Sequence, residues 1–209
     1  MGHSGDERIT GSVARELCQW ENIKAVLNGS ISALGSQYVV SLDAINCATG
    51  ESLTRDQVTA SSKENVLSAL SQVSTRLRSR LGESLASIQK FDKPAQQVTT
   101  TSLDALKAYS LATPLSDQGQ DLQAIPLYER AIQLDPNFAT AYSGLAEIYS
   151  NEGEEQKSIE YMRKAYALRD RVSDRERFAL DSDYHWMVTG DLDKEIANDE
   201  MYHQTWPKW

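Results

Sequence analysis

A 34-residue repeat in the second half of the chain limits the possible folds more than any other feature. When this half is offset by 34 residues, identical residues fall on one another along its length. The matched pairs are Leu111/Leu145, Ala112/Ala146, Ser116/Ser150, Gly119/Gly153, Ile125/Ile159, Ala131/Ala165 and Leu134/Leu168. Such a period indicates a stack of equivalent units, because one unit cannot bury its apolar face alone.

The spacing within one unit predicts two antiparallel helices. Ala108, Ala112 and Leu115 recur at helical spacing, and Gly119 follows them within the polar stretch SDQGQD. Glycine ends a helix readily because it adopts the left-handed backbone conformation at little cost. A second stripe of small and aromatic residues follows, and Pro136 closes the unit because it disfavours helix in the residue before it. Pro114, inside the first helix, is expected to kink or shorten it.

Residues 105–172 resemble two tetratricopeptide repeats, at about 105–138 and 139–172. The resemblance is carried by small, leucine, aromatic, glycine and proline residues at the repeat's packing positions. These are Ala108, Leu111, Ala112, Gly119, Ala124, Tyr128, Ala131, Pro136, Tyr142, Leu145, Ala146, Tyr149, Gly153, Met162 and Ala165. The resemblance implies an all-α solenoid that binds other proteins and has no catalytic activity.

A third, irregular unit is expected over 174–209. Gly190 and Pro207 have the same spacing as Gly119 and Pro136. However, acidic residues stand where small or aromatic ones are expected, at Asp183, Glu195 and Asp199. We therefore predict two helices there, with packing that departs from the first two units.

The first half of the chain has a different periodicity. Residues 11–22 suit a short helix, and three segments rich in β-formers, AVLNGSISAL, YVVSLDAIN and SLTRDQVTA, are separated by short turns. An amphipathic run beginning after Ser62 then predicts a helix. The fold class is thus α+β: a small antiparallel three-stranded sheet with flanking helices, an α-β-β-β-α domain over 11–90, followed by the solenoid.

The segment NGSI…LGSQYVVSLDAINCATGE resembles a module that precedes tetratricopeptide repeats in bacterial signalling proteins with eukaryotic-like Ser/Thr kinase domains. It is also distantly similar to the amino-terminal domain of TolB. No catalytic residue comes with this resemblance. Residues 1–10 are interpreted as a tag or disordered lead, 91–102 as a linker and 103–209 as the repeat array, and the chain as part of a longer protein.

The charge of the chain is unevenly distributed. Residues 1–95 carry ten basic and ten acidic residues, whereas residues 96–209 carry 11 basic and 20 acidic ones, which accounts for the net charge of −9. An acidic surface repels phosphate backbones, so nucleic acid is not an expected partner. No stretch is apolar enough to predict a membrane span.

Candidate binding residues lie on the solenoid. Tyr109 follows the packing residue Ala108 and falls on the face that lines the groove of a tetratricopeptide array. With Asp117, Glu147 and Asn151 it predicts an aromatic and acidic surface for a peptide or protein partner. The Lys, Asn and Arg set with which some such grooves hold a terminal carboxylate is not found on this face.

The sequence predicts no catalytic residue, metal ligand or cofactor. The kinase and phosphate-loop motifs are missing, and His185 near Asp181 and Asp183 offers too few ligands for a metal. Cys18 and Cys47 are interpreted as two small thiols, with a single disulfide as the alternative in an oxidising compartment.

Two functional hypotheses follow. The first is a scaffold that binds a protein or peptide. The alternative is the regulatory or sensor region of a larger bacterial Ser/Thr kinase or other signalling protein, in the cytoplasm or on the periplasmic side of the membrane. Trp206 and Trp209 lie near the end of the array, so self-association through an exposed apolar end is also predicted.

Overall fold

The computed structural model describes residues 24–83 and 100–205. The chain divides into two compact units, Met1–Asp92 and Lys93–Trp209. Each unit is described by itself below. The helix expected over 11–22, Cys18, Trp206 and Trp209 lie outside the described residues.

The first unit contains an antiparallel three-stranded sheet. Its strands are β1 (Ala25–Leu34), β2 (Gln37–Asn46) and β3 (Ser52–Ala60), in the spatial order β1-β2-β3. The turn between β1 and β2 contains Gly35 at a φ of 63°, which suits a glycine. After β2, the side-chain oxygen of Asn46 accepts hydrogen bonds from the backbone N–H groups of Ala48 and Thr49. The predicted meander is confirmed.

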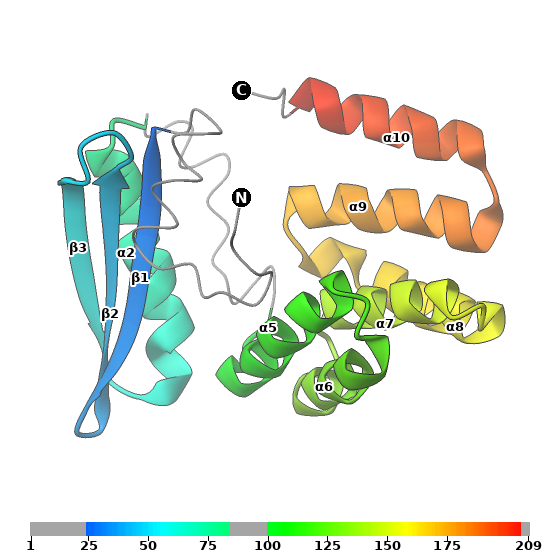
Figure 1. The fold of residues 1–209 in the computed structure, drawn as a ribbon, viewed down its shortest axis with the longest axis horizontal. Coiled ribbons are helices and arrows are strands. Elements are labelled where there is room, and N and C mark those ends of the chain that lie inside the picture. Colours follow the sequence, from blue (N-terminus) through cyan, green and yellow to red (C-terminus); the bar gives the residue numbers. More distant parts are fainter. Residues whose placement is uncertain (1–23, 84–99, 206–209) are drawn as a thin grey trace. The chain divides into compact units, whose positions relative to one another are not determined.

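One helix packs on one face of this sheet. A 3₁₀ turn (η1, Lys63–Asn65) leads into α2 (Val66–Arg80), which lies against β2 and β3 (Figure 1). The α2 side chains that are buried are Val66, Leu67, Ala69, Val73 and Leu77. Val40 and Ala44 on β2 are also buried, and they point to the same face because they are four residues apart in a strand.

The opposite face of the sheet is polar. It carries Asp43 on β2, which accepts hydrogen bonds from Ser52 and from the Arg55 guanidinium. These partners lower the pKa of Asp43, with the Ser52 hydrogen bond as the largest cause. The sheet thus packs one face on α2 and carries this polar group on the other.

Cys47 corrects one prediction. It is buried at the end of β2 and is disulfide-bonded, so it is not the small thiol that the sequence analysis favoured. Cysteine count and spacing could not settle this, because whether two sulfur atoms meet depends on the distance between them in the fold.

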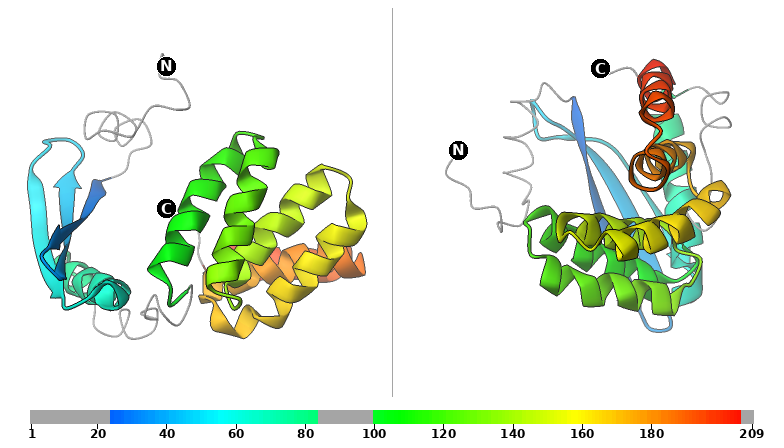
Figure 2. Two further views of the ribbon diagram at one scale, coloured as in Figure 1. Left: turned by 90° about the horizontal axis from the view of Figure 1, so that it is seen from below. Right: turned by 90° about the vertical axis from the view of Figure 1, so that its right-hand side faces the viewer.

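The second unit is a series of helical hairpins. Its helices are α5 (Leu103–Asp117), α6 (Asp121–Leu134), α7 (Ala139–Asn151), α8 (Glu155–Ala167), α9 (Asp174–Tyr184) and α10 (Leu192–Thr205). A 3₁₀ turn (η2, Arg169–Arg171) precedes α9, and a π-helical turn (η3, His185–Thr189) follows it. Figure 2 shows the helices stacked as successive antiparallel pairs. The predicted α+β class with a helical array is confirmed.

Equivalent turns join the helices within the first two pairs. Gly119 and Gly153 have φ values of 70° and 75°, so each adopts the left-handed conformation that ends the first helix of its pair. Pro114 does not shorten α5, which continues to Asp117. The proline lies in the last turn, so the only helical hydrogen bond that it removes is the one its own N–H would donate to Ser110.

Small side chains let the helices approach closely. The core of the first pair consists of alanines on both helices together with Tyr128, Phe138, Leu145 and Ile148. A second cluster, Ala139, Ala146, Met162, Ala165, Val172 and Leu180, joins α7, α8 and α9. Of the repeat-position residues, Tyr142 and Tyr149 are half-buried at the edges of these clusters, and Pro136 is exposed in its loop.

Leu111 does not pack as its repeat position predicts. Its equivalent Leu145 is fully buried, whereas Leu111 is 53% exposed. The reason is its place in the stack: Leu145 belongs to α7, which packs on α6, and α5 begins the array within the described residues. Within the described part of the chain, Leu111 therefore has no preceding helical pair to contact.

The third pair packs through polar groups. The side-chain amide of Asn198 on α10 donates hydrogen bonds to the Phe178 carbonyl and the Ser182 hydroxyl, both at 2.7 Å. The Ser182 hydroxyl in turn donates to Asp199 at 2.6 Å. None of the described residues of α10 is buried. In the first two pairs the helices meet through alanines, whereas α9 and α10 are joined by hydrogen bonds. The residues of the third unit that depart from the repeat pattern thus accompany a different kind of contact.

Candidate functional site

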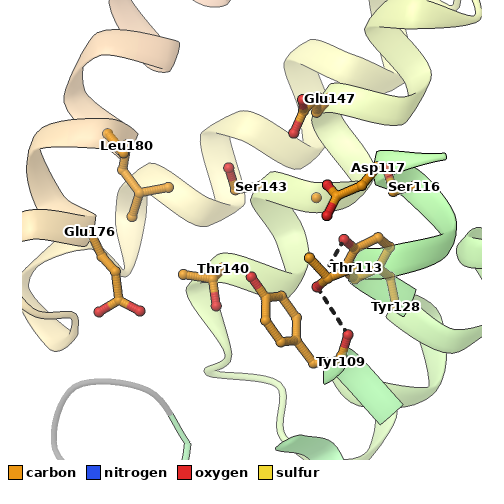
Figure 3. A pocket seen from close by; sticks show the side chains of 12 residues that line it. Tyr109, Thr113, Ser116, Asp117, Tyr128, Thr140, Ser143, Glu147, Glu176 and Leu180 are labelled. Atoms are coloured by element: carbon orange, nitrogen blue, oxygen red, sulfur yellow. Dashed lines mark hydrogen bonds between the residues drawn. The ribbon is translucent and has the colours of Figure 1, made fainter. Parts of the chain in front are cut away.

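A pocket opens among the first helices of the three pairs. It has a volume of about 170 Å³ and is lined by residues of α5, α7 and α9, with one residue of α6. The lining residues are Tyr109, Thr113, Ser116, Asp117, Tyr128, Thr140, Ser143, Gly144, Glu147, Glu176, Ala179 and Leu180. Figure 3 shows Glu176 and Leu180 of α9 across from Tyr109 and Asp117 of α5. We call this site the acidic pocket.

Two tyrosines form its floor. The rings of Tyr109 and Tyr128 meet edge to face with centroids 5.6 Å apart, and Tyr109 also contacts Phe138 at 5.0 Å. The Tyr128 hydroxyl donates to Thr113 Oγ1 at 3.5 Å, and the Thr113 hydroxyl donates to the Tyr109 carbonyl at 3.1 Å (Figure 3). Tyr109 is half-buried, so it supports the helix packing as well as lining the pocket.

Gly144 shapes the pocket, although the sequence analysis did not select it. A Cβ atom at this position would lie 2.6 Å from Cζ of Tyr128, which is closer than real contacts allow. The absence of a side chain therefore makes room for the Tyr128 ring. The signal was available in the sequence, because Gly144 lies within the helical stripe pattern and far from any predicted turn.

Three carboxylates give the pocket its charge. Asp117 and Glu147 are exposed at its rim, and Glu176 comes from α9. Burial raises the pKa of the Tyr128 hydroxyl, and the nearby charges of Glu147 and Asp117 raise it further. Among the described residues that line the pocket there is no lysine, arginine or histidine.

The three carboxylates are not equally available. Glu176 belongs to a capping box at the start of α9, where its carboxylate accepts hydrogen bonds from the backbone and the hydroxyl of Ser173. In contrast, neither Asp117 nor Glu147 takes part in an ion pair within residues 24–83 and 100–205. These two side chains are therefore free to meet a ligand.

Asn151, the fourth residue in the predicted set, does not reach the pocket. It is exposed at the C-terminal end of α7, one turn beyond Glu147 on the same side of the helix. Helical spacing places Asn151 on the same face as Glu147, but the pocket lies nearer to the middle of the helix. The structure thus brings together Tyr109, Asp117 and Glu147 and leaves Asn151 outside.

A second acidic hollow adjoins the first. It has a volume of about 350 Å³, and Ala179 lines both. It lies between α9 and α10 and is lined by three acidic residues, Asp183, Glu195 and Asp199, and one basic residue, Arg175. Burial raises the pKa of Asp183 to about 6, and the charges of Glu147, Asp199 and Glu195 add to the effect. The acidic surface therefore continues from α5 to α10.

Within the described ranges, no group of three or more His, Cys, Asp or Glu residues could hold a metal ion. His185 contacts Thr189, with 3.4 Å between Nδ1 and Oγ1. In the same part of the chain, no helix is long and apolar enough to cross a membrane.

The fold and the pocket define a helical-repeat module, and comparison with protein families identifies the repeats. Residues 115–153 match a family described as TPR repeat, and residues 139–171 match one described as tetratricopeptide repeat. The chain therefore contains tetratricopeptide repeats. Arrays of such repeats present extended surfaces to other proteins, so the match indicates a protein–protein interaction scaffold with a protein partner.

Two solved structures are similar to parts of the chain. The first, described as the crystal structure of MamA, has 19% sequence identity and a TM-score of 0.35, with 68% of this chain and 79% of that one covered. The second, MamA from residue 41 to its end from Desulfovibrio magneticus RS-1, has 15% identity and a TM-score of 0.26, with 71% and 100% covered. No curated protein matches the sequence.

Proposed function

We propose that this chain binds a segment of a partner protein in the acidic pocket. The observation that carries the proposal is the construction of the pocket from α5, α7 and α9, the first helices of three successive pairs. A ligand there would contact several units at once. Three lining side chains on these helices lie outside the buried core and are available for recognition: Asp117, Ser143 and Glu147.

The pocket chemistry favours binding over catalysis. Its lining offers hydroxyls and carboxylates, but among the described lining residues no histidine or cysteine stands beside a hydroxyl as a base or nucleophile. Tyr128 has a raised pKa and stays protonated at neutral pH, so it is a hydrogen-bonding group. The proposed role is a scaffold.

The proposal is tested by affinity capture from a lysate of the source organism with the full chain as bait. A Ser143→Gln variant fills the pocket with an uncharged side chain. A Ser110→Gln variant makes the same change on the exposed surface of α5, outside the pocket. We expect a partner that the native chain and Ser110→Gln retain and Ser143→Gln loses. Equal recovery by all three baits would contradict a role for the pocket.

Self-association through the C-terminal end is a second candidate. Leu192, Ile196 and Met201 on α10, and Trp186 before it, are each more than half exposed. Exposed apolar side chains of this size on neighbouring segments favour contact with another molecule. We expect the mass in solution to rise with concentration, and a Leu192→Gln/Ile196→Gln variant to lower that rise. A monomeric mass for the native chain at all concentrations would exclude this candidate.

The signalling alternative, a regulatory region beside a bacterial Ser/Thr kinase, stays a prediction from the resemblance of the first unit. It is tested by the sequence of the protein that contains this chain. Glycine-loop, HRD and DFG motifs next to it would support the alternative.

A further inference from the structure

The charge of the acidic pocket indicates what kind of segment it takes. We propose that the pocket receives a lysine or arginine side chain from an extended basic segment of a partner protein. This inference rests on the proposed function and adds the chemistry of the ligand. Four features of the molecule support it: the size of the pocket, its aromatic floor, its two carboxylates without an ion pair and the continuation of the acidic surface along α9.

The size of the pocket suits a side chain. Small-molecule and cofactor sites usually have volumes of about 300–1,000 Å³, whereas the acidic pocket has about 170 Å³. Its lining includes the Tyr109 and Tyr128 rings, which meet edge to face (Figure 3). A long aliphatic stem can lie against such rings while its charged end stays near polar groups.

The charged end of that side chain would meet complementary groups. Asp117 and Glu147 stand at the rim, and neither forms an ion pair within the described part of the chain. The hydroxyl of Tyr128 donates its own hydrogen to Thr113, which leaves its oxygen lone pairs able to accept from an ammonium or guanidinium group. A cation above a tyrosine face gains further electrostatic attraction.

Other ligand classes fit this lining less well. A terminal carboxylate or a phosphate would face the carboxylates without a positive side chain from any described lining residue. A purely apolar side chain would have to remove water from Asp117 and Glu147 and would give them no partner in return.

The second hollow also favours a basic side chain. Asp183, Glu195 and Asp199 lie between α9 and α10 and outnumber Arg175, the one basic residue of this lining, whose Nε donates to the Tyr202 hydroxyl. Ala179 joins this hollow to the pocket. The Glu147 charge acts on Asp183 across this junction, together with those of Glu195 and Asp199. Bringing like charges together is unfavourable, and a bound cation relieves it. We therefore expect the segment to carry a second basic residue that reaches this hollow.

The test is fluorescence anisotropy with the full chain and three labelled peptides, in which serine alternates with lysine, glutamine or glutamate. We expect the lysine peptide to bind most tightly and to weaken as salt is added, because ion pairing contributes to its binding. Glu147→Gln and Asp117→Asn are each expected to weaken it about three- to tenfold. The glutamine and glutamate peptides are expected to bind weakly or not at all.

A matched variant separates the contribution of the pocket to peptide affinity from that of the general negative charge of the unit. Glu152→Gln removes one charge from the exposed turn after α7, outside the pocket, and is expected to leave the affinity for the lysine peptide nearly unchanged. An equal loss in Glu147→Gln and Glu152→Gln, or equal affinity for the lysine and glutamine peptides, would overturn the inference.

Ser143→Gln distinguishes this failure from failure of the proposed function. If it still abolished capture of a partner while Glu147→Gln did not weaken capture, the pocket would be a binding site without a preference for cations.

Discussion

At the scale of single residues, the helical unit depends on contacts between side chains of very different size. Tyr128 fills the space beside the alanines of α5 and α6 and reaches the backbone of α7 at Gly144. The same ring forms the floor of the acidic pocket. Packing and the binding surface are therefore coupled at Tyr128, and a change beneath its ring should alter both.

Gly144→Ala tests this coupling. Alanine favours a helix by about 1 kcal/mol over glycine, but its Cβ would overlap the Tyr128 ring, at a cost of about 1–3 kcal/mol for overpacking. We expect a net loss of stability in urea unfolding. Ser110→Ala is the control, because residue 110 occupies the equivalent repeat position and is exposed. A Gly144→Ala variant more stable than the native chain would show that the ring moves freely.

Asp183 predicts a pH dependence of stability. Its pKa is about 6 in the folded protein and near 3.9 in an unfolded chain. The folded state therefore binds the proton more tightly, so the contribution of Asp183 is greatest below about pH 4 and is lost as the pH rises to about 6. A shift of this size corresponds to at most about 3 kcal/mol.

Asp183→Asn should remove this dependence. The test measures the free energy of unfolding in urea at pH 4.5 and at pH 7.5. The difference between variant and native chain is expected to favour the variant more at pH 7.5 than at pH 4.5. Asp193→Asn, an exposed substitution on α10, serves as the control. The same difference between variant and native chain at both pH values would argue against a half-buried, proton-binding Asp183.

At the scale of helices and strands, the pattern of the sequence predicted most of the structure. Strand alternation gave the three-stranded meander, and the 34-residue period gave the first two helical pairs. These patterns succeed because each strand or helix buries one face, which leaves a regular trace in the sequence. The ends of α7 and α9 and the polar contact of α10 depend on individual side chains, so the period alone could not predict them.

The start of α9 illustrates such a local determinant. Ser173 and Glu176 form a capping box, in which each side chain accepts a hydrogen bond from the backbone of the other. Ser173→Ala is expected to lower the free energy of unfolding by about 1 kcal/mol. Glu176→Gln retains an acceptor at the third position and should cost less. Equal losses in the two variants would mean that the hydroxyl does not cap the helix.

The candidate site could be predicted only in part. Tyr109, Asp117 and Glu147 were identified because helical spacing places them on one face, and the structure gathers them in one pocket. Gly144, Glu176 and Leu180 were missed. Glu176 and Leu180 come from α9, and its position relative to α5 depends on how three pairs stack, which a single repeat period does not specify.

At the scale of the whole molecule, the two units differ in charge. The first carries balanced charges, whereas the excess of acidic residues lies after residue 95. In the helical unit these acids include the rim of the acidic pocket and the adjoining hollow between α9 and α10. A field of one sign speeds the approach of an oppositely charged partner, and its effect decreases with added salt.

The central claim, that a partner protein binds in the acidic pocket, is tested most directly by hydrogen–deuterium exchange of the full chain with and without a captured partner. We predict slower exchange on binding in α5 around Tyr109 to Asp117, in α7 around Thr140 to Glu147 and in α9 around Glu176 to Leu180. The exchange rates of the outer helices α6 and α8 should change little. Protection confined to α6, α8 or the sheet of the first unit would contradict the account and move the binding surface elsewhere.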